Sequence, residues 1–311
     1  MGQGENRAGS LVGFGRAAVV LALLGVGLTL RLHGIGRESF WHDEACSAKY
    51  SDTSIAEVLS NNARNDVSPL YHLGLFAWRR LLGDSDVRIR AYSTAWSMVG
   101  LLAIFLFANS IGGRRAALIA LLLATVNPLS IYYAQEARMY SQAAALCALG
   151  SWCLWQWMMA AADCPRPAAW WTWAIGYTLC AAAAIYAHYL SVLILLTQGI
   201  FALLWFAVRR QWTSLAAYLL SGLLVAVAFL PWFLYVCHVI GGFYHPSLDW
   251  IPVPKAGDYL SFLWREFFWG RAQNVREGWW LPTLLLAAIV LGAGFWRWHQ
   301  EPSLPFTSGC G

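Results

Sequence analysis

Long apolar stretches without charged residues constrain this chain more than any other feature of its sequence. A transmembrane helix needs about 20 predominantly apolar residues. The candidate stretches are 15–32, 92–111, 116–134, 141–161, 168–187, 189–208, 212–236 and 279–296. Apart from Arg16 and Arg31 in the first stretch, they contain no Asp, Glu, Lys or Arg. The sequence therefore predicts an all-α, polytopic transmembrane helix bundle of about eight spans.

The composition excludes several classes of protein. Charged residues make up 12% of the 311 residues, about half of the ~25% that is typical of soluble domains. A disordered chain, a basic nucleic-acid-binding protein and an ordinary soluble enzyme are therefore excluded, and we expect no nucleic-acid partner. The cysteines lack C-x-x-C spacing and mostly lie in apolar stretches. We interpret them as small buried residues rather than as a zinc site or a disulfide framework.

Basic residues in the short loops predict the orientation. With the N-terminus in the cytoplasm, each inside segment carries Arg, as the positive-inside rule requires. These residues are Arg7, Arg16, Arg114, Arg115, Arg166, Arg209, Arg210 and Arg297. No small-x-small cleavage site follows the first span, so we expect an uncleaved anchor. We expect an integral protein of the plasma (inner) membrane, with any charged site facing outward.

Two long segments, 33–91 and 237–278, form the outer loops of this arrangement. Ser54-Ile-Ala-Glu57 is a capping-box pattern that predicts a helix start. The apolar segment 69–82 is too short to span, so we expect a helix along the outer surface with Arg79 and Arg80 toward lipid head groups. A second surface helix is expected at 258–269. We expect one transmembrane domain at 1–296 and a short tail at 297–311. Whether this tail is an incomplete C-terminus is left open.

The densest group of ionisable residues in the first outer loop is Trp41-His42-Asp43-Glu44. On a loop or a helix start, one carboxylate can face a cleft while the other caps or pairs. Asp43 is a candidate general base and Glu44 a candidate orienting group. The alternative is that both residues only solvate a loop or cap a helix.

A second group, Gln135-Glu136-Ala137-Arg138-Met139-Tyr140, lies at the outer end of the third span, where Pro128 predicts a kink. Arg138 is suited to hold a phosphate through its planar fork of donors, although a solvated turn is the alternative. Arg88 and Arg90 are further phosphate candidates. His188, between two spans, is more often a packed residue than a ligand, and we include it among the substrate-orienting candidates.

The segment Asp84-Ser85-Asp86 has the D-x-D pattern of soluble glycosyltransferases that use nucleotide sugars. Nucleotide sugars are cytosolic and this loop is expected outside, so a helix cap is the better interpretation. No P-loop, zinc-protease or nucleophile-elbow motif occurs, which leaves ATPase, zincin and serine-hydrolase functions without support.

Several of these residues, in this order, resemble a known family. The order is Asp43-Glu44, Asp66 before Ser68-Pro69-Leu70-Tyr71, Gly83-Asp84-Ser85, Arg90-Ala91-Tyr92-Ser93, Arg114-Arg115, Asn127-Pro128 and Gln135-Glu136-Ala137-Arg138-Met139-Tyr140. Over about residues 10–250 the chain resembles the GT-C membrane glycosyltransferases of the protein mannosyltransferase and aminoarabinose transferase type, including the Rgt-like glycosyltransferases.

The resemblance implies transfer of a sugar, with inversion, from a polyprenyl-phosphate donor to a lipid, glycan or protein acceptor at the outer membrane face. It implies that Asp43 is the acid/base residue, assisted by Glu44, and that Arg90 and Arg138 hold the donor phosphate. Asp66, Gln135, Glu136, Tyr140 and His188 would orient substrates. No cofactor is certain, and a divalent metal is left open.

Two features differ from the family pattern. Val67-Ser68-Pro69 stands where His-Pro-Pro is common, and the chain ends before the further spans that family members usually carry. Two other hypotheses stay open. One is a carrier or flippase of a lipid-linked sugar, which needs the Arg ligands but no general base. The other is a non-catalytic membrane scaffold.

Overall fold

The computed structural model describes residues 2–162, 167–241 and 257, and the regular elements of this part are helices. The chain divides into two units, one of Met1–Val126 with Ser130–Leu248 and one of Asn127–Leu129 with Asp249–Gly311. The candidate site residues named above belong to the first unit. The expected surface helix at 258–269, the expected span at 279–296 and the tail lie outside the described residues.

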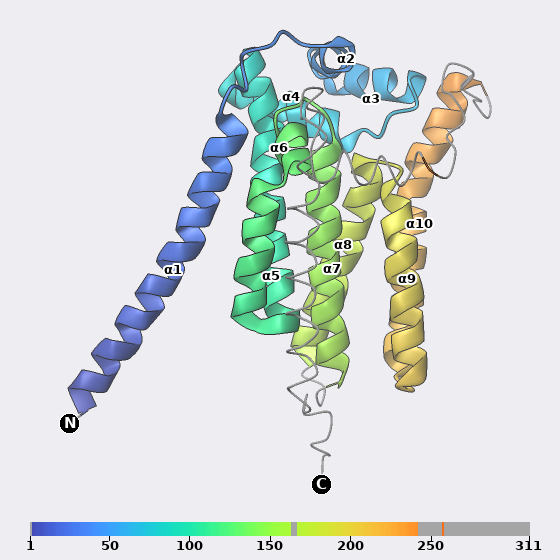
Figure 1. Cartoon of the computed structure of the whole chain (residues 1–311). Coiled ribbons are helices and arrows are strands. Elements are labelled where there is room, and N and C mark those ends of the chain that lie inside the picture. The colour runs from blue at the N-terminus through green and yellow to red at the C-terminus, as the bar shows by residue number, and fades with distance from the viewer. Residues whose placement is uncertain (1, 163–166, 242–256, 258–311) are drawn as a thin grey trace. The chain divides into compact units, whose positions relative to one another are not determined.

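Long apolar helices dominate the first unit (Figure 1). They are α1 (Gly2–Leu32), α5 (Asp86–Val126), α7 (Tyr140–Ala162), α8 (Pro167–Ala187), α9 (Ser191–Val208) and α10 (Trp212–Ile240). Among the described residues, four helices are long and apolar enough to cross a membrane, namely α5, α7, α9 and α10. Large apolar side chains remain exposed on α9 and α10, as Leu204 at 61% and Leu223 at 59% illustrate. An all-α polytopic membrane fold, as the sequence predicts, is confirmed.

Helix α5 contains the expected span 92–111 and the first part of the expected span 116–134. Its backbone breaks at Gly113, where φ is 69°, a left-handed value that glycine adopts without steric cost. The basic turn at Arg114 follows directly. Where Pro128 predicts a kink in the expected span 116–134, the helix is interrupted: α5 ends at Val126 and a new helix, α6 (Pro128–Ala134), begins. Proline lacks an N–H and disfavours helical geometry in the preceding residue, which accounts for the break.

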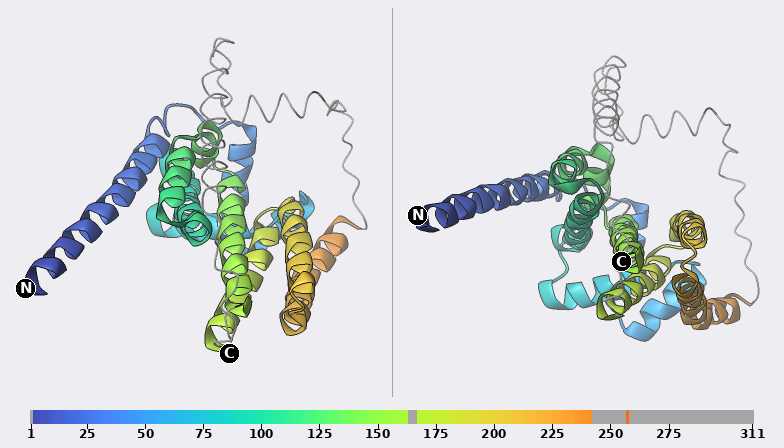
Figure 2. Two further views of the ribbon diagram at one scale, coloured as in Figure 1. Left: turned by 60° about the horizontal axis from the view of Figure 1, so that its bottom comes forward. Right: turned by 90° about the horizontal axis from the view of Figure 1, so that it is seen from below.

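Three short helices, α2 (His42–Tyr50), α3 (Ile55–Arg64) and α4 (Leu70–Leu82), lie in the segment 33–91 and extend across one end of the long helices (Figures 1 and 2). The Ser54 side chain accepts a hydrogen bond from the Glu57 N–H at 3.3 Å, so the predicted N-cap of α3 is present. Helix α4 is confirmed at its expected place. However, it is more than a surface helix, because it buries Tyr71, His72 and Leu75 almost completely.

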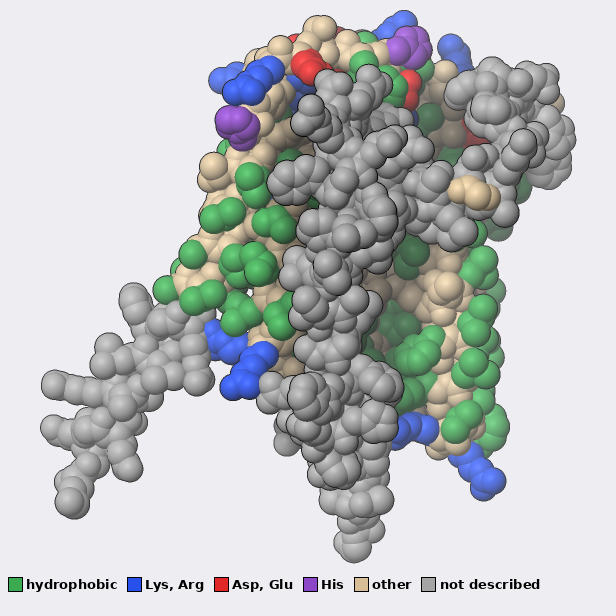
Figure 3. All heavy atoms as spheres, in the orientation of Figure 1, with side chains coloured by type: hydrophobic (Ala, Val, Ile, Leu, Met, Phe, Trp, Pro, Cys, Tyr) green, Lys and Arg blue, Asp and Glu red, His purple; other side chains and the backbone are tan. Residues whose placement is uncertain are grey.

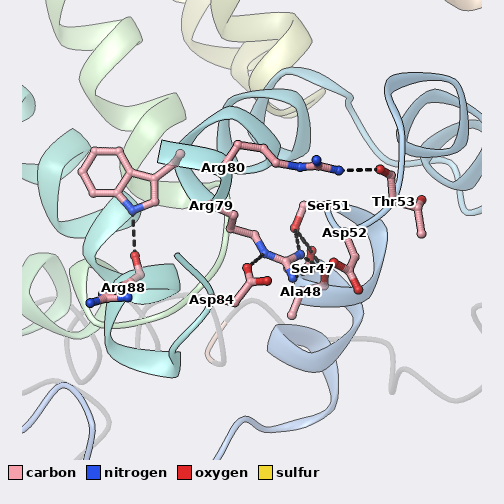
Figure 4. Close-up of polar contacts among 10 residues, drawn as sticks. Ser47, Ala48, Ser51, Asp52, Thr53, Arg79, Arg80, Asp84 and Arg88 are labelled. Atoms are coloured by element: carbon pink, nitrogen blue, oxygen red, sulfur yellow. Dashed lines mark hydrogen bonds and ion pairs between the residues drawn. The ribbon is translucent and has the colours of Figure 1, made fainter. Parts of the chain in front are cut away.

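The two arginines of α4 contact the α2–α3 connection, and for Arg79, whose side chain is 9% exposed, the expected place toward lipid head groups is corrected (Figure 4). Arg79 donates to the Ser51 hydroxyl at 2.9 Å and pairs with Asp52 and Asp84. It also donates to the carbonyl of Ala48 in the last turn of α2. A cation is favoured at that place by the helix dipole. Arg80 donates to the Thr53 carbonyl at 2.9 Å, so both side chains tie α4 to the α2–α3 connection.

The ionisable side chains of the face shown in Figure 3 divide between the two ends of the long helices. Acidic, histidine and basic side chains appear together at the end that carries α2–α4. The opposite end, with the turn of α5 and the α9–α10 connection, shows basic side chains without acidic ones. This distribution is typical of a membrane protein whose basic end faces the cytoplasm.

Candidate functional site

Asp43 and Arg138 lie in contact at the end of the bundle that carries α2. Asp43 occupies the first turn of α2, and Arg138 lies in the connection between α6 and α7. Arg138 Nη2 lies 3.5 Å from Asp43 Oδ2, and Arg138 Nη1 lies 3.4 Å from the Asp43 carbonyl oxygen. The Arg138 side chain is 14% exposed and the Asp43 side chain is 36% exposed. The two segments expected to carry the site therefore meet, although 95 residues separate these positions.

The adjacent carboxylate, Glu44, has a different environment. It is 1% exposed and accepts from Arg90 through both oxygens, at 2.8 Å from Nε and 2.6 Å from Nη2. Glu44 Oε1 also accepts from the N–H of Ala137 at 2.8 Å. The carboxylate of Asp43 is therefore partly exposed, while that of Glu44 is buried and binds the backbone N–H of Ala137, next to Arg138.

The guanidinium of Arg90 has no N–H left for a phosphate. Besides Glu44, it donates to the carbonyl oxygens of Ile35, Glu38 and Ser39 at 2.8–3.3 Å. These bonds use the five N–H groups of an arginine. Arg90 as a phosphate ligand is therefore not favoured by this arrangement.

The segment that carries Arg138 is fixed on several sides. Gln135 Nε2 donates to the carbonyl oxygens of Leu30 at 3.2 Å and His33 at 2.9 Å, at the end of α1. Two side chains of α5 complete the attachment, Thr94 to the Ala134 carbonyl at 2.8 Å and Ser93 to the Arg138 carbonyl at 3.1 Å. Glu136 is buried in the same segment. Gln135 thus has a structural contact in addition to any role in orienting a substrate.

Aromatic and imidazole rings surround Arg138. Its guanidinium carbon lies 5.8 Å from the centre of the Tyr140 ring, and the Tyr140 ring lies 5.6 Å from that of His188. Burial and then the positive charge of Arg138 lower the pKa of His72 to about 3, and the same two causes lower the pKa of His188. Both imidazoles are therefore neutral at pH 7. Arg138 Nε is buried without a hydrogen-bond partner, which is costly unless a ligand or water supplies one.

Asp66 lies at a different place from the Asp43–Arg138 contact. It has an unusual positive φ of 50° and lines a mostly apolar cavity of about 410 Å³. Tyr189, Trp232 and other residues of α8–α10 and their connections line the remainder, and neither Asp43 nor Arg138 does. Ser68, in the segment that departs from His-Pro-Pro, donates to the Ile185 carbonyl at 3.1 Å.

The described part of the chain contains no group of three or more His, Cys, Asp or Glu residues that would hold a metal ion. In the D-x-D segment, Asp84 pairs with Arg79, and Asp86 is the first residue of α5. These contacts agree with a structural role for the segment.

One important residue was not expected from the sequence. Arg31 is fully buried, and it binds α5 and α6 from the end of α1. The sequence did carry a signal for Arg31, because it is a charged residue in an apolar stretch. A charged residue in such a stretch often has a functional role.

Comparisons with known proteins agree with this fold. The apo crystal structure of ArnT from Cupriavidus metallidurans is similar, with a TM-score of 0.56 and 19% sequence identity. The alignment covers 93% of this chain and 54% of ArnT, so the chain spans about half the length of that protein. A comparison with curated protein sequences finds no significant match.

The family comparison covers more than half of the chain. The profile of the dolichyl-phosphate-mannose-protein mannosyltransferases matches residues 66–235, from the end of α3 through most of α10. The matched range includes Arg90 and Arg138, and the preceding segment supplies Asp43 and Glu44. The expected GT-C fold is confirmed, and the chain belongs to the dolichyl-phosphate-mannose-protein mannosyltransferase family.

Proposed function

We propose that this chain is a membrane glycosyltransferase that moves a sugar from a polyprenyl-phosphate donor to an acceptor at the outer face of the membrane, with inversion at the anomeric carbon. The observation that carries the proposal is the contact between Asp43 and Arg138. It brings together one accessible carboxylate and one arginine at the end of the bundle that is rich in ionisable side chains. Family membership supports the same chemistry.

Asp43 is the proposed general base. It takes the proton from the acceptor hydroxyl while the hydroxyl oxygen forms a bond to the anomeric carbon. The bond from that carbon to the phosphate oxygen breaks, and polyprenyl phosphate leaves with its electron pair. Direct displacement inverts the anomeric carbon and needs one base on the side opposite the leaving group, as in inverting glycosidases. The half-exposed position of Asp43 allows an acceptor to approach it.

Arg138 is the proposed ligand of the donor phosphate. Its 3.5 Å separation from Asp43 exceeds the 2.7–2.9 Å typical of a charge-assisted hydrogen bond. By comparison, Arg90 and Glu44 approach to 2.6 Å. A loose pair with an unpaired Nε can exchange partners when a phosphate arrives. The neutral imidazoles nearby add no charge, so stabilisation of the departing phosphate comes from Arg138 in a partly desolvated site.

The remaining candidates have supporting roles in this proposal. Glu44 and Arg90 form a buried pair that holds the Ala137 N–H and, through it, the Arg138 segment. Gln135 and Glu136 maintain that segment. Tyr140 and His188 line the Arg138 side of the site. Asp66, at its apolar cavity, is the proposed contact for the acceptor or for the lipid portion of a substrate. No step requires a metal ion.

The outward-facing position of the proposed site restricts which sugar donor the enzyme can use. Nucleotide sugars are cytosolic, so an enzyme that works outside must receive its sugar from a lipid carrier. A lipid phosphate lies at head-group depth, where an arginine at the end of a membrane helix can reach it. We therefore place the protein in the inner membrane with the Asp43–Arg138 contact outward, in agreement with the basic opposite end.

Replacement of Asp43 by Asn tests the general base. We expect polyprenyl-phosphate release in membranes that supply native acceptors to fall about 10²–10⁴-fold, the usual contribution of general base catalysis. Binding of polyprenyl phosphate should stay equal or become tighter, because Arg138 loses a competing anion. Asp52→Asn is the matched control, since Asp52 also pairs with an arginine but is 61% exposed and lies outside the proposed site.

A carrier or flippase of lipid-linked sugar is the second candidate, favoured by the apolar cavity beside Asp66. Such a protein needs the arginine but not the base. Unchanged movement of lipid-linked sugar across vesicles by Asp43→Asn, with no sugar transfer by the wild type, would favour the carrier and reject the enzyme.

A further inference from the structure

Arg31 is a fully buried arginine at the outer end of α1, and the structure shows no ion pair for it among the described residues. Nε donates to the Ser97 hydroxyl at 2.8 Å. Nη1 donates to the carbonyl oxygens of Gly27 and Thr125, each at 3.1 Å. Nη2 donates to the Ala124 carbonyl at 3.2 Å and the Ser130 hydroxyl at 2.8 Å. Neutral oxygen atoms thus satisfy the five N–H groups of a buried cation.

Two of these acceptors explain how the charge is stabilised. Ala124 and Thr125 lie in the last turn of α5, which ends at Val126. The last carbonyl groups of a helix have no partner within the helix and carry the negative end of its dipole. Arg31 therefore caps the C-terminus of α5, and the negative end of the α5 dipole stabilises its charge in place of a carboxylate.

The same end of α1 also holds the chain that follows α5. Arg31 reaches Ser130 in α6, and Gln135 beyond α6 donates back to Leu30 and His33. The segment 130–138 is thus attached to the end of α1 at two places, Ser130 and Gln135. Arg138, which contacts Asp43, lies at the end of this segment. None of the hydrogen bonds of Arg31 reaches Asp43 or Arg138 directly.

We infer that Arg31 is a positioning residue for the proposed transfer reaction. It caps α5 and binds α6, and so it sets where the segment 130–138 leaves the bundle and where Arg138 lies beside Asp43. The inference rests on the proposed function for its catalytic consequence. Its structural part, the attachment of the segment, is independent of any activity.

The test compares four variants in reconstituted full-length protein. Arg31→Met removes every donor at similar length, and Arg31→Lys keeps the charge at the helix end but loses the planar fork. Ser130→Ala removes the α6 acceptor of Arg31 but leaves the four other hydrogen bonds of Arg31, so it is the milder variant if Arg31→Met folds poorly. Tyr177→Phe is the control, because it removes a buried 2.9 Å bond to Tyr218 in the α8–α10 core.

Hydrogen exchange is the first measurement. In Arg31→Met and Ser130→Ala, amides of residues 134–138 should exchange about 10–100-fold faster, the range set by loss of a charge-assisted hydrogen bond. Amides of α8–α10 should be unchanged. Tyr177→Phe should leave residues 134–138 unchanged. Arg31→Lys should recover part of the protection. Exchange at residues 134–138 that equals the wild type in Arg31→Met and Ser130→Ala overturns the inference.

Turnover per folded molecule is the second measurement, with release of dolichyl phosphate from dolichyl-phosphate mannose as the probe. Displacement of a substrate-binding group by about 1 Å can lower the rate about 10²-fold, so we expect that loss in kcat for Arg31→Met and a normal kcat for Tyr177→Phe. Faster local exchange with a normal kcat overturns the catalytic part. A wild type that releases no dolichyl phosphate counts against the proposed function with this donor, and exchange alone then decides the role of Arg31.

Discussion

The buried pair of Glu44 and Arg90 gives the sharpest prediction about stability. Glu44→Gln removes the charge but keeps the size of the side chain. Arg90 is 5% exposed and donates two hydrogen bonds to the Glu44 carboxylate. In the variant, one of these two bonds would meet an amide N–H₂ group, and the charge of Arg90 would have no opposite charge beside it. Loss of one partner from a buried pair costs about 3–5 kcal/mol. The two arginine bonds to Glu44, at about 1.5–3 kcal/mol each, give a similar figure.

Unfolding of the purified protein in detergent micelles measures this cost. Asp52→Asn is the matched control, because it removes a carboxylate that also pairs with an arginine, Arg79, but is itself 61% exposed. Such a pair contributes about 0–1 kcal/mol. We therefore expect Glu44→Gln to lower the free energy of unfolding by several times more than Asp52→Asn. Equal stability of the two variants would refute the claim that Glu44 and Arg90 hold the site together.

Two further predictions concern helix α4. The pKa of His72 is lowered to about 3, below the unfolded value of 6.5. The unfolded chain therefore binds more protons between these values, and stability falls as pH drops below 6.5. At pH 5.0 the loss is about 2 kcal/mol, and it should disappear in His72→Phe; equal pH dependence of the two proteins would contradict it. A Cβ at Gly74 would overlap the hydroxyl group of Tyr92, whose ring packs against Trp78. Gly74→Ala should cost about 1–3 kcal/mol, whereas Gly222→Ala, with open space at its Cβ, should be neutral or stabilising; a neutral Gly74→Ala would show that Tyr92 moves freely.

The helices could be predicted from the sequence because long uncharged apolar stretches have few alternatives in a membrane. The break after Val126 was less predictable. Pro128 marks a disturbance of the helix, but a kink and a restart have the same local sequence. The difference depends on what holds the new helix, and here Arg31 binds both the end of α5 and Ser130 of α6.

The site could be predicted in part. Two separated segments with suitable chemistry pointed to Asp43 and Arg138, and the structure places these residues in contact. The sequence could not assign the other arginines, because a guanidinium binds whichever acceptors the tertiary structure presents. Arg79 meets the end of α2 rather than lipid head groups, and Arg90 meets Glu44 and three carbonyl oxygens rather than an open site.

A double-mutant cycle on transfer activity tests most directly whether Asp43 and Arg138 act in one site. The cycle uses Asp43→Asn, Arg138→Gln and the double variant, with kcat/KM for sugar release from the lipid donor as the measurement. Residues that act together show a coupling energy of about 0.5–3 kcal/mol. We predict that the double variant is about as slow as the slower single variant. Losses that multiply, as expected for two independent residues, would contradict the account.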